Sequence, residues 1–542
     1  MKIKKHFLFL LLILAIASIL RLWQLGVNPP SLDWDEASLG YNAYSILKTG
    51  ADEYGNFLPT SIRSFNDYKP AAYVYLTIPS VFIFGLNEFA VRLPSAALGI
   101  LTVLFTYLLV KELFKAKNLQ FAEAAALVSA LLLAISPWHL QFSRSAFEGN
   151  VGVFFFVGGI YFLLKALNKG LFFAPAFIFF VLTFYSYHSF RLVTPLFLLF
   201  SIFYFRKEIL EKKKHFLVSA LFALILTLPL LLSIFTNLAR FSSVTIFNSS
   251  GILDTSIKQL ELDRERENVL GEIFHNRRVV YAQNILDGYL SHFDPVFLFL
   301  RGDSVERHHA IGMGMLYIIE LPFLLVGIFY LSRKKDTGRL ILLIWLLAAP
   351  AAASLATGTP HAIRAIAMIP VLQVITAIGI VAFYEWNKKA KLGKFIIFTF
   401  SALFLLNALY YLDMYYVHTP IENSKYWQYG YRQVFEYAKE RQDKYDKIIV
   451  TYKYDQPYIY YLFFNKIEPS WYQKNWDYNN DGEIERMTRI IGKYEFRNID
   501  YAVDSKAKNV LLIGTPDEIS QNASIKEINF LDGTVAFRIA ES

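Results

Sequence analysis

The sequence predicts a polytopic all-α membrane domain followed by a small soluble α/β domain. The chain of 542 residues is 55% hydrophobic with a mean hydropathy of +0.35, which is too apolar for an ordinary soluble protein. Its apolar residues recur in runs of about twenty, the length that a helix needs to cross a bilayer. After residue 412 the runs shorten and charged residues become more frequent, as in a soluble domain.

Charge and cysteine content exclude several classes of function. The formal net charge is +9, but the basic residues lie in short loops between the apolar runs. This placement is typical of membrane topology and not of nucleic-acid binding, so no nucleic-acid partner is expected. The chain has no cysteine, which excludes disulfides, thiolate catalysis and cysteine-ligated zinc or iron–sulfur sites.

Eleven apolar runs are predicted to cross the membrane. The first contains the small-residue triplet 15–17 inside the apolar run, so we expect a retained signal anchor and not a cleaved signal peptide. Segment 71–85 is expected to rest at the outer interface, because a crossing there would invert the later basic loops against the positive-inside rule. The predicted spans are 7–25, 93–110, 122–136, 151–164, 171–186, 192–205, 216–235, 311–331, 340–356, 366–384 and 395–412.

The same topology sets the domain organisation. With the N-terminus cytoplasmic, we expect a plasma-membrane protein with a transmembrane domain, 1–412, and an exported α/β domain, 413–542. The outer loops of the membrane domain are 26–92, 137–150, 185–191, 236–310 and 357–364. The longest loop is expected to hold helices around 256–268 and 277–290. In the exported domain the predicted strands and helix are 447–452, 509–514, 534–539 and 431–441.

The first outer loop holds the strongest candidate for a catalytic site. Three carboxylates, Asp33, Asp35 and Glu36, stand at its start, and Lys69 precedes a proline at its end. Residues 36–47 are predicted to form an amphipathic helix whose positive N-terminus favours the acidic side chains. Such carboxylates can act as a general base or as metal ligands, and the alternative is an acidic cap on a surface helix.

Basic side chains recur on the predicted outer face, where positive charge is otherwise scarce. Cations beside a bilayer suit a phosphate or diphosphate headgroup, because arginine offers paired donors to phosphate oxygens and lysine supplies a point charge. The alternative is that each side chain reaches bulk lipid phosphate on its own. The residues are Lys69, Arg144, His188, Arg191, Arg301, Arg307, His361 and Arg364.

Three further features have two interpretations each. Arg144 and Glu148 are four residues apart, so on one helix they would share a face and could simply pair. His308 and His309 form a candidate metal pair, although no carboxylate lies at a diagnostic spacing. Glu320 is expected in the middle of a span, as a functional acid or as a packing hydrogen bond.

Five segments of the outer loops and their borders carry a family resemblance. They are DWDE (33–36), YKPAAYVYL (68–76), NEFAVRLPSAALG (87–99), SPWHLQFSRSAFEGN (136–150) and TPHAIRAIAMIP (359–370). In this order they resemble membrane glycosyltransferases of the GT-C superfamily. In particular they resemble bacterial relatives of the dolichyl-phosphate-mannose protein mannosyltransferases and the aminoarabinose transferases that modify lipid A. The resemblance covers roughly the first 410 residues and implies a GT-C type membrane domain.

The resemblance also implies roles for individual residues. It implies a catalytic base at Asp35, with Glu36 beside it, and a lipid-phosphate contact at Lys69. Glu148 stands where the family offers an aspartate, so Glu148 and Arg144 mark a second acidic site. Asp35 and Glu148 are the candidate ligands for a divalent metal, and no other cofactor is expected. Further candidates for the lipid phosphate are Arg301, Arg307 and Arg364.

These observations together predict a glycosyltransferase that moves a sugar from a polyprenyl-phosphate carrier to a hydroxyl acceptor on the outer face. The acceptor would be a protein, a lipid or a glycan. A phosphate leaving group needs cations and no general acid, whereas a hydroxyl nucleophile needs a base, and direct displacement would invert the anomeric centre. One alternative is a flippase or transporter of lipid-linked glycans. Another is a scaffold for the exported domain.

Overall fold

The computed structural model describes residues 2–65, 67–115, 119–236, 245–248, 251–333, 337–475 and 489–542. The chain forms two compact units. The helical unit comprises residues 1–20, 98–142 and 148–411. The sheet unit comprises residues 21–97, 143–147 and 412–542. The division into domains 1–412 and 413–542 stays a prediction.

Long apolar helices make up most of the helical unit. A helix satisfies its backbone polar groups internally, as the interior of a bilayer requires. The long helices are α1 (Lys2–Leu22), α4 (Glu88–Leu113), α5 (Leu119–Ile135), α7 (Glu148–Ala166), α8 (Phe173–Ser186), α9 (Phe190–Tyr204), α11 (Lys213–Thr236), α16 (Glu320–Ser332), α17 (Thr337–Ala348), α19 (Val371–Asn387) and α20 (Gly393–Asp413). Shorter ones are α6 (Pro137–Arg144), α10 (Arg206–Glu211) and α18 (Ala351–Ser354).

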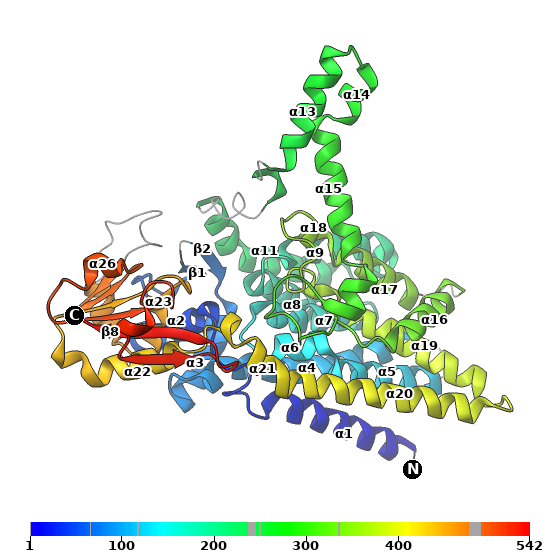
Figure 1. The fold of residues 1–542 in the computed structure, drawn as a ribbon. Helices are drawn as coiled ribbons and strands as arrows, with labels where there is room; N and C mark the ends of the chain where they lie inside the picture. The colour runs from blue at the N-terminus through cyan, green and yellow to red at the C-terminus, as the bar shows by residue number, and fades with distance from the viewer. Residues whose placement is uncertain are drawn as a thin grey trace. The chain divides into compact units, whose positions relative to one another are not determined.

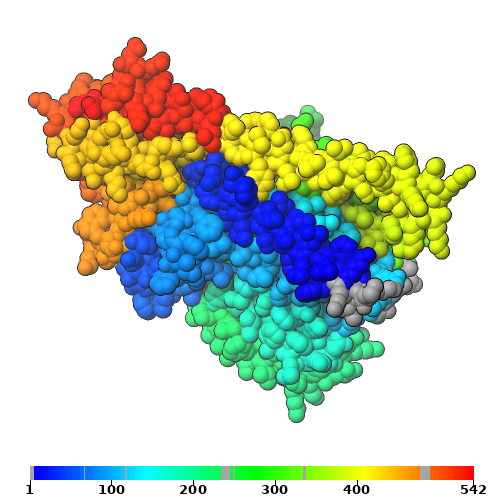
Figure 2. Space-filling model, turned by 90° about the horizontal axis from the view of Figure 1, so that it is seen from below, coloured from blue at the N-terminus to red at the C-terminus, as the bar shows by residue number. Residues whose placement is uncertain are grey.

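Glycines allow two of these helices to pack with their backbones in contact, as is common for membrane helices. A Cβ atom at Gly327 of α16 would lie 2.0 Å from the carbonyl oxygen of Ile375. One at Gly379 of α19 would lie 1.9 Å from the carbonyl oxygen of Phe323. An alanine at either position would therefore force α16 and α19 apart. By contrast, apolar side chains of α1 are exposed, and Figure 2 shows this helix at the surface of its unit.

Seven helices among the described residues are long and apolar enough to cross a membrane. An eighth span results if the bent pair α5 and α6 is counted as one. The predicted spans 171–186, 192–205 and 311–331 correspond to the shorter apolar helices α8, α9 and α16. Segment 71–85 forms α3 (Ala72–Phe84), a helix of 13 residues. The chain is thus a multi-pass membrane protein.

The condition under which Arg144 and Glu148 would share a helix face is not met, since α6 ends at Arg144 and α7 begins at Glu148. One prediction about a helix is wrong. Glu320 does not lie in the middle of a span, because residues 311–319 form no helix and α16 begins at Glu320. At the first position of a helix, the positive end of the helix dipole favours a carboxylate.

The longest predicted loop, 236–310, contains the two predicted helices. They are α13 (Gly251–Glu265) and α15 (Arg277–Ser291), with α14 (Val269–Phe274) between them. The three helices extend from the other helices of this unit as an arm (Figure 1). After the arm, η3 (Val296–Arg301) leads into an irregular segment that carries two histidines.

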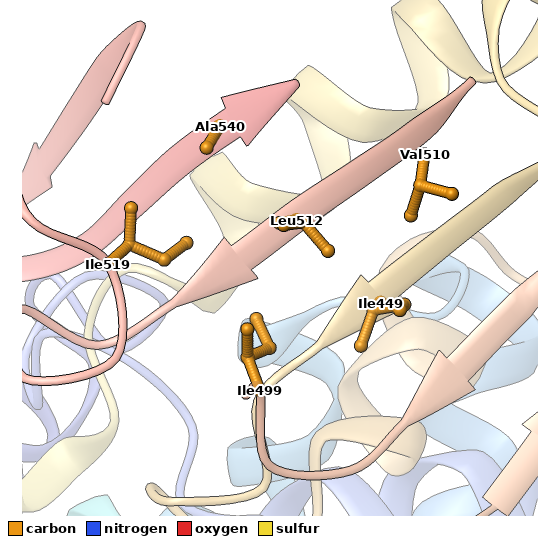
Figure 3. Packing of buried hydrophobic residues seen from close by; sticks show 6 residues of the cluster. All are labelled: Ile449, Ile499, Val510, Leu512, Ile519 and Ala540. Carbon is orange, nitrogen blue, oxygen red and sulfur yellow. The ribbon is translucent and has the colours of Figure 1, made fainter. Parts of the chain in front are cut away.

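The sheet unit is built around a mixed sheet of six strands in the order β4-β5-β3-β6-β8-β7. β3 pairs in parallel with β5 and β6, and the other pairs are antiparallel. Buried side chains of β3, β6 and β8 pack with Ile499 and Ile519 from connecting segments (Figure 3). The strands are β3 (Lys447–Val450), β4 (Arg489–Ile491), β5 (Tyr494–Phe496), β6 (Val510–Gly514), β7 (Lys526–Asn529) and β8 (Val535–Glu541).

The predicted strands 447–452, 509–514 and 534–539 are confirmed as β3, β6 and β8, and the predicted helix is α22 (Tyr431–Arg441). The sequence did not predict β4, β5 and β7. Two of these have only three residues, which is too short to show an alternating pattern.

The first predicted loop, 26–92, packs into the same unit as the sheet. It contains α2 (Trp34–Thr49), the hairpin of β1 (Ser61–Ser64) and β2 (Asp67–Pro70), and α3. Helix α2 contacts α23 (Pro457–Phe464) so closely that a Cβ at Gly40 would lie 2.7 Å from the ring of Phe463. From α24 (Pro469–Asn475), the Gln473 amide donates to Ser45 Oγ at 3.0 Å and to the Asp52 carbonyl at 2.8 Å. The C-terminal residues therefore support the helix that carries Asp35 and Glu36.

Candidate active site

A capping box fixes the start of α2. The amide of Glu36 donates to Asp33 Oδ1 at 2.8 Å, and Glu36 Oε2 accepts from the amide of Asp33 at 3.3 Å. This reciprocal pair satisfies two amides that a helix start otherwise leaves unpaired. The acidic cap is therefore Asp33 together with Glu36, and Asp35 takes no part in it.

Glu36 is also held by a buried ion pair with Arg92 of α4. The Arg92 guanidinium donates to Glu36 Oε1 at 2.9 Å and to Oε2 at 2.8 Å, and both side chains are almost fully buried. Glu36 Oε1 accepts a further hydrogen bond from the amide of Ala146 at 2.8 Å. With four donors around it, the Glu36 carboxylate ties the loop segments of the sheet unit together. The Arg92 guanidinium also donates to the carbonyls of Leu25, Pro29 and Ser31.

Asp35 points in another direction and pairs with Lys69. The Lys69 ammonium donates to Asp35 Oδ1, so β2 returns the lysine to the first turn of α2. The Asp35 side chain is 37% exposed, whereas that of Lys69 is 9% exposed and lies over the Phe65 ring. The structure thus brings together the predicted base and the predicted phosphate ligand. A carboxylate and a cation at one partly open position can receive a proton and bind an anion.

The two residues of the predicted second acidic site lie in different environments. Arg144 belongs to the sheet unit, where its guanidinium donates to the carbonyl of Asn28 at 2.8 Å and lies 5.1 Å from the Tyr416 ring. Such hydrogen bonding and cation–π packing stabilise a buried arginine. Glu148 belongs to the helical unit, where it is buried as the first residue of α7.

A second polar cluster lies in the helical unit, where it joins the loop after η3 to the loop before α19. Asp303 Oδ2 lies 2.6 Å from Nδ1 of His308 and 4.0 Å from Nδ1 of His361. The same oxygen accepts a hydrogen bond from the amide of Ala362 at 2.7 Å. Asp303 therefore supplies the carboxylate for His308, although no carboxylate stands at a diagnostic spacing in the sequence. Asp303 lies five residues upstream in an irregular loop, at a distance in sequence that no helix or zinc-motif spacing would have indicated.

Burial and neighbouring charges set the protonation of this cluster. Burial alone would raise the pKa of Asp303, but the adjacent His308 and the Ala362 amide lower it to about 2. Burial, together with the charges of His308 and Arg364, lowers the pKa of His361 to about 3. At neutral pH the cluster therefore contains an ionised carboxylate and an uncharged His361.

Three of the predicted lipid-phosphate ligands, Arg301, Arg307 and Arg364, lie within a few residues of this second cluster in the sequence. Arg364 donates to the carbonyl of Thr357 at 2.6 Å, within the loop that carries His361. Arg307 precedes His308, and its backbone carbonyl accepts from the Gln141 amide at 2.6 Å. Arg301 is the exposed last residue of η3.

Sequence comparison relates part of the chain to known proteins. Residues 68–232 match the model of the dolichyl-phosphate-mannose-protein mannosyltransferase family, a segment that includes Lys69 and Glu148 but begins after Asp35. Over 165 residues the chain is 28% identical to the predicted mannosyltransferase YkcB of Bacillus subtilis (strain 168). That match covers 30% of this chain and 21% of YkcB.

Structural comparison extends the likeness to nearly the whole chain. The fold is similar to that of ArnT from Cupriavidus metallidurans bound to undecaprenyl phosphate, with a TM-score of 0.53 at 12% identity, covering 98% of this chain and 97% of ArnT. It is also similar to the archaeal oligosaccharyltransferase AglB from Archaeoglobus fulgidus in complex with an inhibitory peptide and a dolichol-phosphate. There the TM-score is 0.52 at 15% identity, covering 85% of this chain and 64% of AglB. The expected resemblance is confirmed: residues 68–232 are similar to the dolichyl-phosphate-mannose-protein mannosyltransferase family, and the fold of the chain is similar to that of ArnT.

Proposed function

We propose that this protein is a membrane glycosyltransferase that transfers a sugar from a polyprenyl-phosphate carrier to a hydroxyl acceptor. The observation that carries the proposal is the pairing of Asp35 with Lys69 at the partly exposed start of α2. The family match over residues 68–232 and the ArnT-like fold support the same reaction class.

In the proposed reaction Asp35 is the general base. Its carboxylate removes the proton from the acceptor hydroxyl as the oxygen attacks the anomeric carbon. The bond from that carbon to the phosphate oxygen breaks on the opposite side, so the configuration inverts. The phosphate leaves as an anion and needs no proton, only positive charge to stabilise it. Lys69 provides that charge.

Before substrate binds, Lys69 is paired with the Asp35 carboxylate. When a lipid phosphate arrives, Lys69 exchanges the Asp35 carboxylate for phosphate oxygens. Glu36, which is held by Arg92 and the Ala146 amide, is a positioning residue that fixes the first turn of α2.

Arg301, Arg307 and Arg364 are further candidates for binding the carrier phosphate. The side chains of Arg307 and Arg364 flank a buried histidine cluster, and Arg301 is exposed. A metal shared by Asp35 and Glu148 is not part of the proposed reaction. The Asp35 oxygen already holds an ammonium group, which opposes a divalent cation on the same carboxylate.

We also propose the finer topology: eleven spans, a cytoplasmic N-terminus, and the site and C-terminal residues outside the plasma membrane. The eight candidate spans together with α8, α9 and α16 add up to this number. The positive-inside rule supports the orientation. The proposed donor is a sugar on a polyprenyl phosphate, since the ArnT and AglB structures carry undecaprenyl phosphate and dolichol-phosphate. The proposed acceptor is a protein, a lipid or a glycan.

The direct test uses the purified full chain with a panel of polyprenyl-phosphate sugars and a panel of hydroxyl acceptors. Release of lipid phosphate together with glycosylated acceptor is the expected result, and Asp35→Asn serves as the inactive control. Movement of the intact lipid-linked sugar across vesicles without release of lipid phosphate would contradict the proposal and indicate a flippase.

A further inference from the structure

We infer that Asp303, His308 and His361 form a binding site for a transition-metal dication such as Zn²⁺. One potential ligand atom from each residue lies within 4.8 Å of the others. Asp303 and His308 come from the loop after η3, and His361 comes from the loop before α19. All three belong to the helical unit, whereas Asp35 and Lys69 belong to the sheet unit, so the inference does not depend on the proposed transfer reaction.

The donor set points to a particular class of metal. Two imidazole nitrogens and one carboxylate oxygen are typical ligands of Zn²⁺ and its neighbours among the transition metals. Mg²⁺ and Ca²⁺ prefer sites made of oxygen atoms and fit poorly here. Three protein ligands leave one position of a tetrahedron open for water or for an anionic oxygen.

Small movements would bring the three ligands around one ion. Zinc bonds of about 2.0–2.1 Å place neighbouring ligand atoms of a tetrahedron about 3.3 Å apart. Asp303 Oδ2 now lies 2.6 Å from His308 Nδ1 and 4.0 Å from His361 Nδ1. The first distance must grow and the second must shrink, each by less than 1 Å. The ion would take the place of the proton between His308 Nδ1 and Asp303, so the neutral imidazole of His308 would carry its proton on Nε2 instead.

The unsatisfied Nδ1 atom of His361 supports the presence of a metal ion most directly. Among the described residues its Nδ1 atom is buried and has no hydrogen-bond partner. A buried polar atom without a partner costs free energy that a bond to a metal would recover. The loop is nevertheless held in place, because the His361 amide donates to His292 Nε2 at 3.1 Å. His292 in turn donates from Nδ1 to the carbonyl of Gly288 at 2.6 Å.

The neighbouring arginines suggest what fills the open position. Arg307 and Arg364 lie near enough to influence His308 and His361, and two guanidinium groups oppose a lone dication. An anionic oxygen bound to the metal would remove this repulsion. Inorganic phosphate is therefore expected to tighten metal binding.

The inference is tested with the full chain, purified without a polyhistidine tag and stripped of metal by a chelator. Titration with Zn²⁺ should show one ion per chain and a higher Tm, and Mg²⁺ should have no comparable effect. Asp303→Asn and His361→Gln should each weaken Zn²⁺ binding by at least about 10- to 100-fold. Changing a residue that only supports a metal ligand already costs this much in affinity, and losing the ligand itself should cost no less. The exposed His215 provides the control His215→Gln, which should bind as the parent chain does.

Co²⁺ gives a second measurement that does not depend on stability. Its visible spectrum should change on binding to the parent chain and not on binding to folded His361→Gln. Inorganic phosphate should lower the Kd for Zn²⁺ in the parent chain. Failure to bind Zn²⁺ with or without phosphate, or equal binding by the parent chain and both ligand variants, would overturn the inference.

Discussion

Lys69 and Asp35 form an ion pair although they are 34 residues apart in the sequence. The β1–β2 hairpin returns the chain so that the Lys69 ammonium reaches the first turn of α2. Asp35 is more than one-third exposed and Lys69 is nearly buried, so a ligand that reaches the carboxylate also meets the cation. We expect an incoming phosphate to compete with Asp35 for Lys69. Binding of the donor would then free the Asp35 carboxylate from its ion pair.

The first prediction concerns the proton acceptor. Asp35→Asn keeps the shape of the side chain but cannot take a proton, so kcat should fall by about 10²–10⁴-fold. Binding of the lipid phosphate should not weaken, because the neutral amide leaves Lys69 available. Turnover and carrier binding are measured on the same preparation. Near-normal turnover in a variant that still binds its carrier would show that Asp35 is not the base.

The second prediction separates Glu36 from Asp35. Glu36→Gln leaves the buried Arg92 charge without its carboxylate, a change that typically costs about 3–5 kcal/mol of folding free energy. Its Tm should therefore drop well below that of Asp35→Asn. The folded fraction should lose less turnover than Asp35→Asn loses.

The exposed pair of Asp517 and Lys453 offers a control for this comparison. Asp517→Asn should cost about 0–1 kcal/mol, as surface pairs generally do. An inactive Glu36→Gln with an unchanged Tm would mean that Glu36, and not Asp35, takes the proton.

The third prediction concerns the lipid phosphate. Lys69→Ala and Arg364→Ala should each weaken binding of a polyprenyl phosphate by about 1.5–3 kcal/mol, the value of a charge-assisted hydrogen bond. This corresponds to roughly a 10- to 150-fold rise in Kd. Lys48→Ala, at an exposed position of the same helix α2, should leave Kd unchanged. Unchanged Kd in both test variants would mean that these cations do not contact the carrier.

The fourth prediction concerns the support of α2 by the C-terminal residues. The Gln473 amide contacts Ser45, Thr49 and the Asp52 carbonyl. Gln473→Ala should cost about 1–3 kcal/mol of folding free energy, because buried acceptors lose their donor. It should also lower kcat by loosening the helix that carries Asp35. The neighbouring exposed position supplies the control Lys474→Ala, and equal Tm and kcat for both variants would rule out this supporting role.

The fifth prediction concerns topology. Single cysteines can be placed freely, since the chain has none of its own. Cysteines that replace Asn56, Asn87, Asn248 or Asn475 should react with an impermeant reagent added outside. Those that replace Lys115, Lys212 or Lys389 should be protected until the membrane is opened. Labelling of the Lys115 and Lys212 positions from outside would contradict the eleven-span topology.

Local patterns in the sequence explain why several elements were predicted correctly. A run of apolar residues forms a membrane helix wherever it stands, because the bilayer leaves its backbone no other partner. The acidic start of α2 was expected, but its capping box of Asp33 and Glu36 was not predicted, although the box joins residues only three positions apart. Helix α16 began later than predicted because hydropathy does not mark where an apolar segment turns irregular.

The sequence by itself determined the membrane helices, three of the strands in the C-terminal sheet, and the residue types from which a phosphate-handling site can be made. Only the tertiary structure decided which of these residues meet. In it Lys69 pairs with Asp35, Glu36 pairs with Arg92, and Asp303 lies beside His361, which is 58 residues away in the sequence. Helical and strand periodicity report contacts a few residues apart, whereas these pairs form through irregular loops. Their partners are set by how the loops pack, which no local spacing records.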